Sequence, residues 1–274
     1  MGIIVGIDIG GSITKIVGLK QEKPLMPMRV KANDPVASLF GAFGKFIDTN
    51  DLKLADVEKV MLTGVGASFV TKPIYGLPTG RVAEFLANGL GGLYLSKLER
   101  AVIVSMGTGT ALVKAAGDGD IVHIGGTGIG GGTILGLSSR MLNIRDIDIV
   151  MKLAETGDLS NIDLMVGDIT KDELLGLPPD MTASNFGKIS DVATQSDIAL
   201  GILNMVFQSI GTAAYFAIRP TDINDVVLIG SLSAMPHSRA VFARLCELFG
   251  VRFIIPDNSE YGTAFGAALA NTGN

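Results

Sequence analysis

Cysteine and histidine are scarce in this sequence, and their scarcity narrows the chemistry available to it. One cysteine, Cys246, and two histidines, His123 and His237, occur among 274 residues. A single cysteine cannot form an intramolecular disulfide, and there is no cysteine and histidine cluster to hold zinc. Cys246 lies in a segment with helical spacing of apolar residues, so we expect a buried, inert thiol. These absences favour a reducing compartment, and we expect a cytoplasmic protein.

Positive charge is also limited. Lysine and arginine total 22 against 27 aspartates and glutamates, a formal net charge of -5, with an isoelectric point near 5.1. Such a chain has no broad positive field for a phosphate backbone, so no nucleic acid partner is expected. The apolar run 3–9 is interrupted by Asp8 and is far too short to span a membrane. It predicts a buried strand, and no membrane association is expected.

Glycine, in contrast, is abundant. The chain has 36 glycines, more than the roughly 7% of average soluble proteins. They cluster at the ends of apolar runs, where turns and ligand contacts favour a backbone without Cβ. Apolar runs typical of strands alternate along the chain with segments that have the apolar spacing of helices. This alternation predicts an α/β protein. Expected strands are 2–9, 12–19, 57–62, 101–105, 111–115, 121–124, 226–230 and 252–255; expected helices are 35–47 (capped by Asn33 or Asp34), 81–95, from about 133, 198–218, 238–249 and from 261.

Two glycine turns between predicted strands are candidate phosphate loops. The P-loop signature G-x-x-x-x-G-K-[ST] is absent, so a nucleotide has to be held in another way. Either turn alone could be an ordinary tight β-turn, but backbone amides in a facing pair can hold phosphates, with Asp8 holding magnesium directly or through water and Lys15 offsetting phosphate charge. The first turn contains Asp8, Ile9, Gly10, Gly11, Ser12, Ile13, Thr14 and Lys15; the second contains Gly107, Thr108 and Gly109.

These turns form part of a longer series of motifs that resembles the type II pantothenate kinases of the actin/hexokinase/Hsp70-like superfamily. The other motifs, in that family's order over nearly the whole chain, are Gly125 to Gly132, Gly157-Asp158, Asp163-Leu164 and Thr182-Ala183-Ser184-Asn185-Phe186-Gly187. The resemblance implies an α/β actin-like (ribonuclease H-like) fold of two related lobes with the ATP site in the cleft between them. The implied lobes are 1–98 and 99–274, with a helical insertion around 143–197 in the second. It also implies ATP contacts from Gly131, Gly132 and Thr133, and adenosine contacts from Gly230 and Ser231.

The activity that this resemblance implies is phosphorylation of pantothenate to 4'-phosphopantothenate, the first step towards coenzyme A, with ATP and Mg²⁺. In that family a glutamate at the start of a helix acts as general base, and Glu84 matches it; Glu84 and Thr108 are also expected to contact the substrate. The plain alternative is that Glu84 faces water and only favours the helix dipole.

One position departs from the family pattern. The arginine that commonly precedes the glycine block appears here as His123, a weaker and switchable donor. Arg81, expected one helical turn before Glu84, could supply the lost charge as a further substrate contact, although an ordinary surface arginine explains it too. His237 is expected at the surface.

The resemblance also implies a homodimer, with the long apolar helix 198–218 as a candidate interface. Burial of that helix within the monomer explains its composition equally well.

Other functions of the same fold remain alternatives. A kinase for a sugar or another small alcohol is weakened because no convincing aspartate base precedes the second phosphate turn. An activator ATPase of radical dehydratases needs cysteines for an iron-sulfur cluster, and Cys246 alone cannot supply them. A non-catalytic ATP-binding regulator is disfavoured because Asp8, Lys15 and Glu84 are all present.

Overall fold

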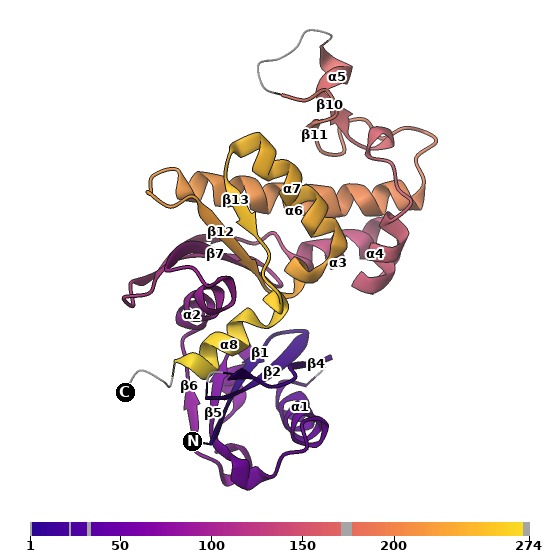
Figure 1. Cartoon of the computed structure of the whole chain (residues 1–274). Helices are drawn as coiled ribbons and strands as arrows, with labels where there is room; N and C mark the ends of the chain where they lie inside the picture. The colour runs from indigo at the N-terminus through magenta and orange to yellow at the C-terminus, as the bar shows by residue number, and fades with distance from the viewer. Residues whose placement is uncertain (1, 22, 32–33, 171–176, 271–274) are drawn as a thin grey trace.

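Two β-sheets of related topology form the framework of the protein (Figure 1). The computed structural model describes residues 2–21, 23–31, 34–170 and 177–270. The first sheet has the order β3-β2-β1-β5-β6 with β4 also paired to β2, and the second has the order β13-β12-β7-β8-β9. In each sheet an antiparallel hairpin, β1-β2 or β7-β8, is extended by two parallel strands. The two halves therefore repeat one topology.

The element bounds follow the predicted alternation of strands and helices closely. The strands are β1 (Ile3–Ile9), β2 (Ile13–Lys20), β3 (Lys23–Pro24), β4 (Met28–Lys31), β5 (Val57–Thr63), β6 (Thr79–Arg81), β7 (Arg100–Met106), β8 (Thr110–Ala116), β9 (Ile121–Thr127), β10 (Leu164–Met165), β11 (Thr182–Ser184), β12 (Asp225–Ile229) and β13 (Arg252–Ile254). The α-helices are α1 (Pro35–Thr49), α2 (Glu84–Ser96), α3 (Gly131–Met141), α4 (Ile147–Ala154), α5 (Val166–Ile169), α6 (Gln195–Ile218), α7 (Pro236–Phe249) and α8 (Gly262–Leu269). Short 3-10 helices are η1 (Leu54–Asp56), η2 (Val65–Phe69), η3 (Ile74–Gly76), η4 (Leu159–Asn161), η5 (Ser231–Ala234) and η6 (Ser259–Tyr261).

Local capping chemistry sets the helix ends. The Asp34 side chain accepts a hydrogen bond from the Ala37 amide at 2.8 Å, and Pro35 occupies the first turn of α1, where a missing N–H costs nothing. The other predicted cap, Asn33, lies outside the described residues. At α6 the side chain of Thr194 accepts from the Asp197 amide, and the Asp197 carboxylate accepts from the Thr194 amide.

Helices cover both faces of each sheet. On the first sheet α1 packs its phenylalanines against the isoleucines of β1, while α8 covers the opposite face. On the second sheet α2 covers one face, and α3, α4, α6 and α7 build the larger core on the other. The α6 helix is long and apolar enough to cross a membrane by length and composition alone, but 56% of its most apolar window is buried within the protein. Its apolar composition is therefore explained by this core.

Helices α2 and α8 cross between the two sheets (Figure 1). A Cβ on Gly91 would lie 1.8 Å from the Gly262 carbonyl oxygen, and a Cβ on Gly266 would lie 1.7 Å from the Ala87 carbonyl oxygen. The backbones can approach this closely only because glycine has no side chain. α2 packs on β7 and β8, whereas α8, from the end of the chain, packs on β1 and β2. Each half thus supplies a helix that packs on the sheet of the other half. The lobe boundary between residues 98 and 99 stays a prediction.

Two predicted element bounds are wrong because strand pairing overrides the local pattern. The helix expected over 81–95 begins at Glu84, since residues 79–81 form β6 and pair in parallel with β5. Arg81 is therefore a strand residue and does not lie one helical turn before Glu84. The strand expected over 121–124 continues to Thr127 through its pairing with β8, and α3 begins at Gly131.

The predicted insertion and two isolated residues also differ from expectation. Residues 143–197 contain a small two-stranded sheet, β10 and β11, besides their helices; residues 171–176 of this segment lie outside the described residues. β10, β11 and α5 extend from the second lobe on the side away from the first sheet (Figure 1). His237, expected at the surface, is half-buried, and burial lowers the pKa of its ring. Cys246 is half-buried in α7, and its Sγ accepts from the Phe253 amide at 3.3 Å.

Candidate functional site

A buried ion pair lies at the end of the first hairpin. Asp8 and Lys15 are cross-strand partners in β1 and β2, with Nζ and Oδ2 3.9 Å apart and side chains only 13% and 6% exposed. The turn between the strands is closed by the Gly10 amide, which donates to the Ile13 carbonyl at 3.1 Å. A Cβ on Gly10 would lie 2.8 Å from that carbonyl oxygen, so the tight turn requires glycine here.

Burial dominates the electrostatics of this pair. It raises the pKa of Asp8, an effect that Lys15 opposes, and it lowers the pKa of Lys15, an effect that Asp8 and then Glu260 oppose. Gly64, at φ +85°, makes room for the carboxylate: a Cβ there would lie 2.6 Å from the Asp8 Oδ1 atom. Water solvates neither charged group well. A ligand that carries both positive and negative charge, such as a metal-bound phosphate, would therefore stabilise the charged forms of both.

Glu84 lies in the same electrostatic neighbourhood. It is the first residue of α2, and its pKa is raised first by partial burial of its carboxyl group and second by the negative charge of Asp8, while Lys15 lowers it. Much of the residue remains exposed, so a substrate can reach it. The structure thus brings together three of the predicted residues, Asp8, Lys15 and Glu84, from three separate elements.

The second glycine turn is held by the start of α3. The amides of Gly131 and Gly132 donate to the carbonyls of Gly107 and Thr108 at 2.8 and 2.9 Å. A Cβ on Gly130 would lie 2.6 Å from the Thr108 carbonyl oxygen, so the glycine block allows helix and turn to meet. These two amides are therefore used within the protein. Thr108 itself is exposed.

The hydroxyl of Thr133 has partners within the glycine block. It accepts from the Gly130 amide at 3.1 Å and donates to the Gly128 carbonyl at 3.2 Å. Roles of Gly131, Gly132 and Thr133 in binding ATP stay predictions.

The third predicted element lies beside the second turn. Gly230 has φ +94°, and a Cβ there would lie 2.5 Å from the carbonyl oxygen of Met106, the residue before Gly107. The Gly230 amide donates to the Ser259 carbonyl at 3.0 Å, and its carbonyl accepts from the Ser233 hydroxyl at 2.7 Å. Ser231 opens η5 directly after it. The Gly230-Ser231 turn and the second glycine turn are thus neighbours.

His123 contacts a residue that the sequence did not single out. Its ring stacks on Phe85, with centroids 3.9 Å apart and an interplanar angle of 7°. A register shift between β8 and β9, with Leu112 opposite Gly125 but Val113 opposite His123, lies at this point, and such bulges often reorient side chains beside functional sites. Phe85 follows Glu84 directly, so His123 lies next to the first turn of α2.

Arg81 is tied to a neighbouring loop. Its guanidinium donates to the Val70 carbonyl, which connects β6 to the segment after η2. One such bond uses one of five donors. A contact between Arg81 and a substrate stays a prediction.

The residues around Asp8 fit a magnesium ion bound largely by water and phosphate. Within the described ranges there is no group of three or more His, Cys, Asp or Glu residues that could hold a metal. Mg²⁺ commonly uses one or two carboxylates together with waters and substrate phosphates, so Asp8 alone is sufficient. The hydroxyl of Thr63, the cross-strand partner of Asp8 in β5, is buried and has no hydrogen-bond partner in the described part of the chain. A metal-bound water would provide one.

Two of the family motifs meet around Asp163, which is fully buried. Its carboxylate accepts hydrogen bonds from the Phe186 amide at 2.9 Å, the Asn204 amide group at 2.9 Å and the Thr182 hydroxyl at 3.0 Å. Four acceptor sites on one carboxylate can serve several donors at once. Asp163 therefore joins the 182–187 motif to α6 and organises the insertion.

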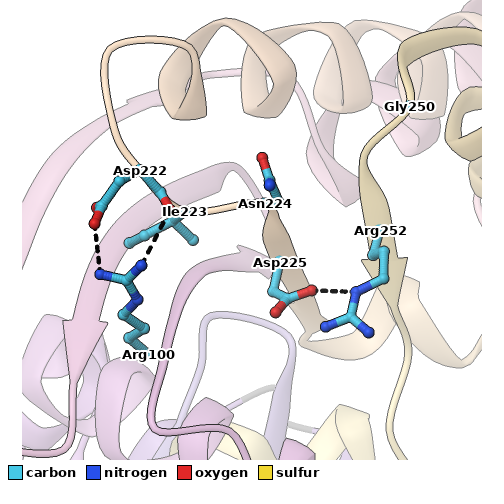
Figure 2. Close-up of a pocket in the computed structure, with 7 residues that line it drawn as sticks. All are labelled: Arg100, Asp222, Ile223, Asn224, Asp225, Gly250 and Arg252. Atoms are coloured by element: carbon cyan, nitrogen blue, oxygen red, sulfur yellow. Dashed lines mark hydrogen bonds and ion pairs between the residues drawn. The ribbon is translucent and has the colours of Figure 1, made fainter.

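A groove of about 440 Å³ lies at the N-terminal ends of β7, β12 and β13 in the second sheet (Figure 2). Two ion pairs line it, Arg100 with Asp222 at 2.6 Å and Arg252 with Asp225 at 2.5 Å. Both arginines are more than half exposed and already paired. The turns at Gly107 and Gly230 follow the C-terminal ends of β7 and β12. This groove is therefore separate from the site around Asp8.

Known proteins resemble the chain in sequence over almost its full length. The family described as Fumble matches residues 99–242. A type II pantothenate kinase of Staphylococcus epidermidis is 30% identical, with the match covering 96% of this chain and 98% of that protein. A type II pantothenate kinase of Bacillus anthracis is 28% identical, covering 98% and 93% respectively.

Solved structures resemble the fold at low sequence identity. The activator of 2-hydroxyisocaproyl-CoA dehydratase from Clostridium difficile, with bound ADPNP, has a TM-score of 0.71 at 18% identity, covering 98% of this chain and 93% of that one. A ROK family protein from Streptococcus pneumoniae has a TM-score of 0.56 at 13% identity, covering 98% and 99%. At such identities the likeness concerns the fold alone, and it confirms the predicted two-lobed, actin-like ATPase architecture.

Proposed function

The chain belongs to the Fumble family, and from this premise we propose that it is a pantothenate kinase that transfers the γ-phosphate of ATP to the primary hydroxyl of pantothenate. The observation that carries the proposal is the meeting of Asp8, Lys15 and Glu84 beside a glycine turn, in a chain that matches type II pantothenate kinases from end to end. Phosphoryl transfer needs positioning and charge stabilisation rather than covalent chemistry. A charged pair and a separate carboxylate supply those two needs.

Glu84 is proposed as the general base. A carboxylate assists most when its pKa is raised towards the working pH, because it then accepts a proton more readily while still being ionised. Burial and Asp8 shift the pKa of Glu84 in that direction. Its exposure leaves room for the pantothenate hydroxyl, whose proton it would take as the oxygen attacks the phosphorus.

Asp8, Lys15 and the glycine turns are proposed to hold ATP. Mg²⁺, when bound, would supply positive charge that offsets the negative charge developing on the transferred group. Asp8 would hold it directly or through water, and Lys15, held 3.9 Å from Asp8 in a buried setting, would face phosphate oxygens with little competition from solvent. The second turn around Thr108 and the Gly230-Ser231 turn would close on the phosphates and adenosine from the second lobe.

His123 is proposed to contact pantothenate in place of the family's arginine. Its stacking on Phe85, next to Glu84, supports a position beside the acceptor. An imidazole binds a carboxylate less strongly than a guanidinium does, so we expect a higher KM for pantothenate than an arginine at this position would give.

We further propose a cytoplasmic homodimer. α6 is mostly covered by other helices, but the insertion exposes the apolar side chains of Ile169 (62%), Ile189 (55%) and Val192 (77%). Large apolar side chains exposed on the insertion favour an interface there. A dimer mass in multi-angle light scattering that Val192→Asp converts to a monomer mass is the expected result; a wild-type monomer would contradict this assignment.

The reaction is tested by identifying its product. Purified protein is incubated with Mg²⁺, ATP and pantothenate, and ³¹P NMR with mass spectrometry should show a new phosphomonoester whose mass is that of 4'-phosphopantothenate. Parallel reactions with a panel of sugars should show none. A phosphorylated sugar in place of phosphopantothenate would retain the fold and overturn the substrate.

A further inference from the structure

The hydroxyl of Thr63 is an exception to the usual pairing of buried polar groups. Thr63 is 1% exposed, and its Oγ1 atom has no hydrogen-bond partner among the residues the structure describes. Burying a hydroxyl without a partner costs folding free energy, since its hydrogen bonds to water are lost and not replaced. Valine has nearly the same shape and would avoid this cost. An unpaired hydroxyl at such a position needs an explanation outside the folded chain itself.

The location of Thr63 provides that explanation. Lys15, Asp8 and Thr63 are cross-strand partners on β2, β1 and β5, three adjacent strands. Side chains of paired residues in neighbouring strands point to the same face of a sheet, so the ammonium, carboxylate and hydroxyl groups form one row. Met61, two residues earlier on β5, packs on that face against Ala87 of α2. The row therefore lies on the face of the first sheet that α8 covers, which the start of α2, with Glu84, also approaches.

The residue after Thr63 keeps this end of the row open. Gly64 has φ +85°, and a Cβ there would lie 2.6 Å from the Asp8 Oδ1 atom. The chain thus turns away directly beside Asp8 without placing a side chain there. Thr63 and Asp8 together present a hydroxyl and a carboxylate, the oxygen chemistry that suits the hydrated sphere of a divalent cation.

We propose that Thr63 is a further binding residue of the nucleotide site, whose hydroxyl donates a hydrogen bond to an oxygen of the hydrated Mg²⁺-phosphate group held at Asp8. This inference rests on the proposed function, since it requires that Asp8 faces a metal-bound phosphate. The ligand oxygen then satisfies the hydroxyl that the folded chain leaves unpaired. Thr63 is neither the base nor the nucleophile; it contributes binding and orientation.

The test separates binding from stability with two variants. Thr63→Val removes the unpaired hydroxyl. Thr79→Val, on the neighbouring strand β6, serves as the matched control because it removes a hydroxyl that is already paired within the protein. The Thr79 hydroxyl accepts from the Ile74 amide at 3.0 Å and donates to the Leu77 carbonyl at 2.9 Å. Isothermal titration calorimetry with Mg²⁺ and ADP should show Kd raised about ten- to a hundredfold in Thr63→Val, the size expected for one hydrogen bond to a charged ligand. Thr79→Val should leave Kd within twofold.

In thermal unfolding without ligand, the control variant rather than Thr63→Val should show the larger loss. Thr63→Val should melt at or above the wild-type temperature, whereas Thr79→Val should melt lower because it loses two internal hydrogen bonds. Thr63→Ser, which keeps the hydroxyl, should restore most of the Mg²⁺-ADP affinity. A Thr63→Val protein that melts lower than wild type, or that binds Mg²⁺-ADP as tightly, would overturn the assignment of Thr63. Wild-type protein that binds no Mg²⁺-ADP would instead overturn the proposed kinase site as a whole.

Discussion

Gly91→Ala is expected to destabilise the protein although it places a better helix former in the middle of a helix. Alanine favours a helix interior over glycine by about 1 kcal/mol. At Gly91, however, the new Cβ would lie 1.8 Å from the Gly262 carbonyl oxygen and 3.0 Å from the Gly266 amide nitrogen. The obstacle is backbone, so α2 and α8 have to separate, and overpacking of this kind costs about 1–3 kcal/mol or more. A contact of 1.8 Å with backbone calls for the upper end of that range, about 3 kcal/mol, so after the gain in helix propensity we expect a net loss of about 2 kcal/mol, or roughly 4–8 °C in Tm.

Gly44→Ala provides the matched control. Gly44 lies within α1, is exposed, and has no atom within 4 Å of where its Cβ would be. The same substitution there should raise Tm by about 2–4 °C, because only the helix propensity changes. Circular dichroism melts of both variants without ligand give the comparison. If Gly91→Ala melted at or above the wild-type temperature, the close packing of α2 on α8 would be refuted, and with it the support that positions Glu84.

Three further predictions concern the site. Glu84→Gln should lower kcat at least about a hundredfold while the Kd of Mg²⁺-ADP stays within twofold; equal losses in kinetics and calorimetry would mean that the residue is structural. Because burial and Asp8 raise the pKa of Glu84, the acidic limb of kcat/KM should lie above the usual glutamate value of 4.5, with activity rising as pH rises and the carboxyl group loses its proton; a limb at or below that value would contradict the assignment. His123→Arg should lower the KM for pantothenate about three- to tenfold by adding a permanent charge that can still stack on Phe85; an unchanged KM would mean that His123 does not contact the acceptor.

The features predicted correctly from the sequence depend on local chemistry. The hairpin around Gly10 and the cap of α1 at Asp34 follow from residues within a few positions of each other, so their patterns can be read directly. The alternation of strands and helices likewise predicted an α/β protein, whereas its two related lobes were expected through the family resemblance. The meeting of Asp8, Lys15 and Glu84 was expected only through the family resemblance, because no local pattern connects a hairpin to the start of a helix 70 residues later.

The features that were missed depend on pairing across the chain. Arg81 belongs to β6 only because β5 lies beside it, and its local spacing is equally compatible with a helix. Thr63 ends an ordinary apolar strand, and nothing in its neighbours reveals that Asp8 is its partner. Phe85 was visible as an apolar residue beside the predicted base, but its stacking partner is 38 positions away and is aligned by an irregularity in β9. Pairing register and bulges arise from the assembled sheet.

The central claim, phosphoryl transfer from ATP to pantothenate at this site, is tested most directly by ADP release. Wild-type protein is assayed with Mg²⁺ and ATP, with and without pantothenate, and phosphopantothenate is measured in the same samples. We predict that pantothenate stimulates ADP release and that one phosphopantothenate forms for each ADP released. ADP release that is indifferent to pantothenate, or that responds only to a sugar, would contradict the account.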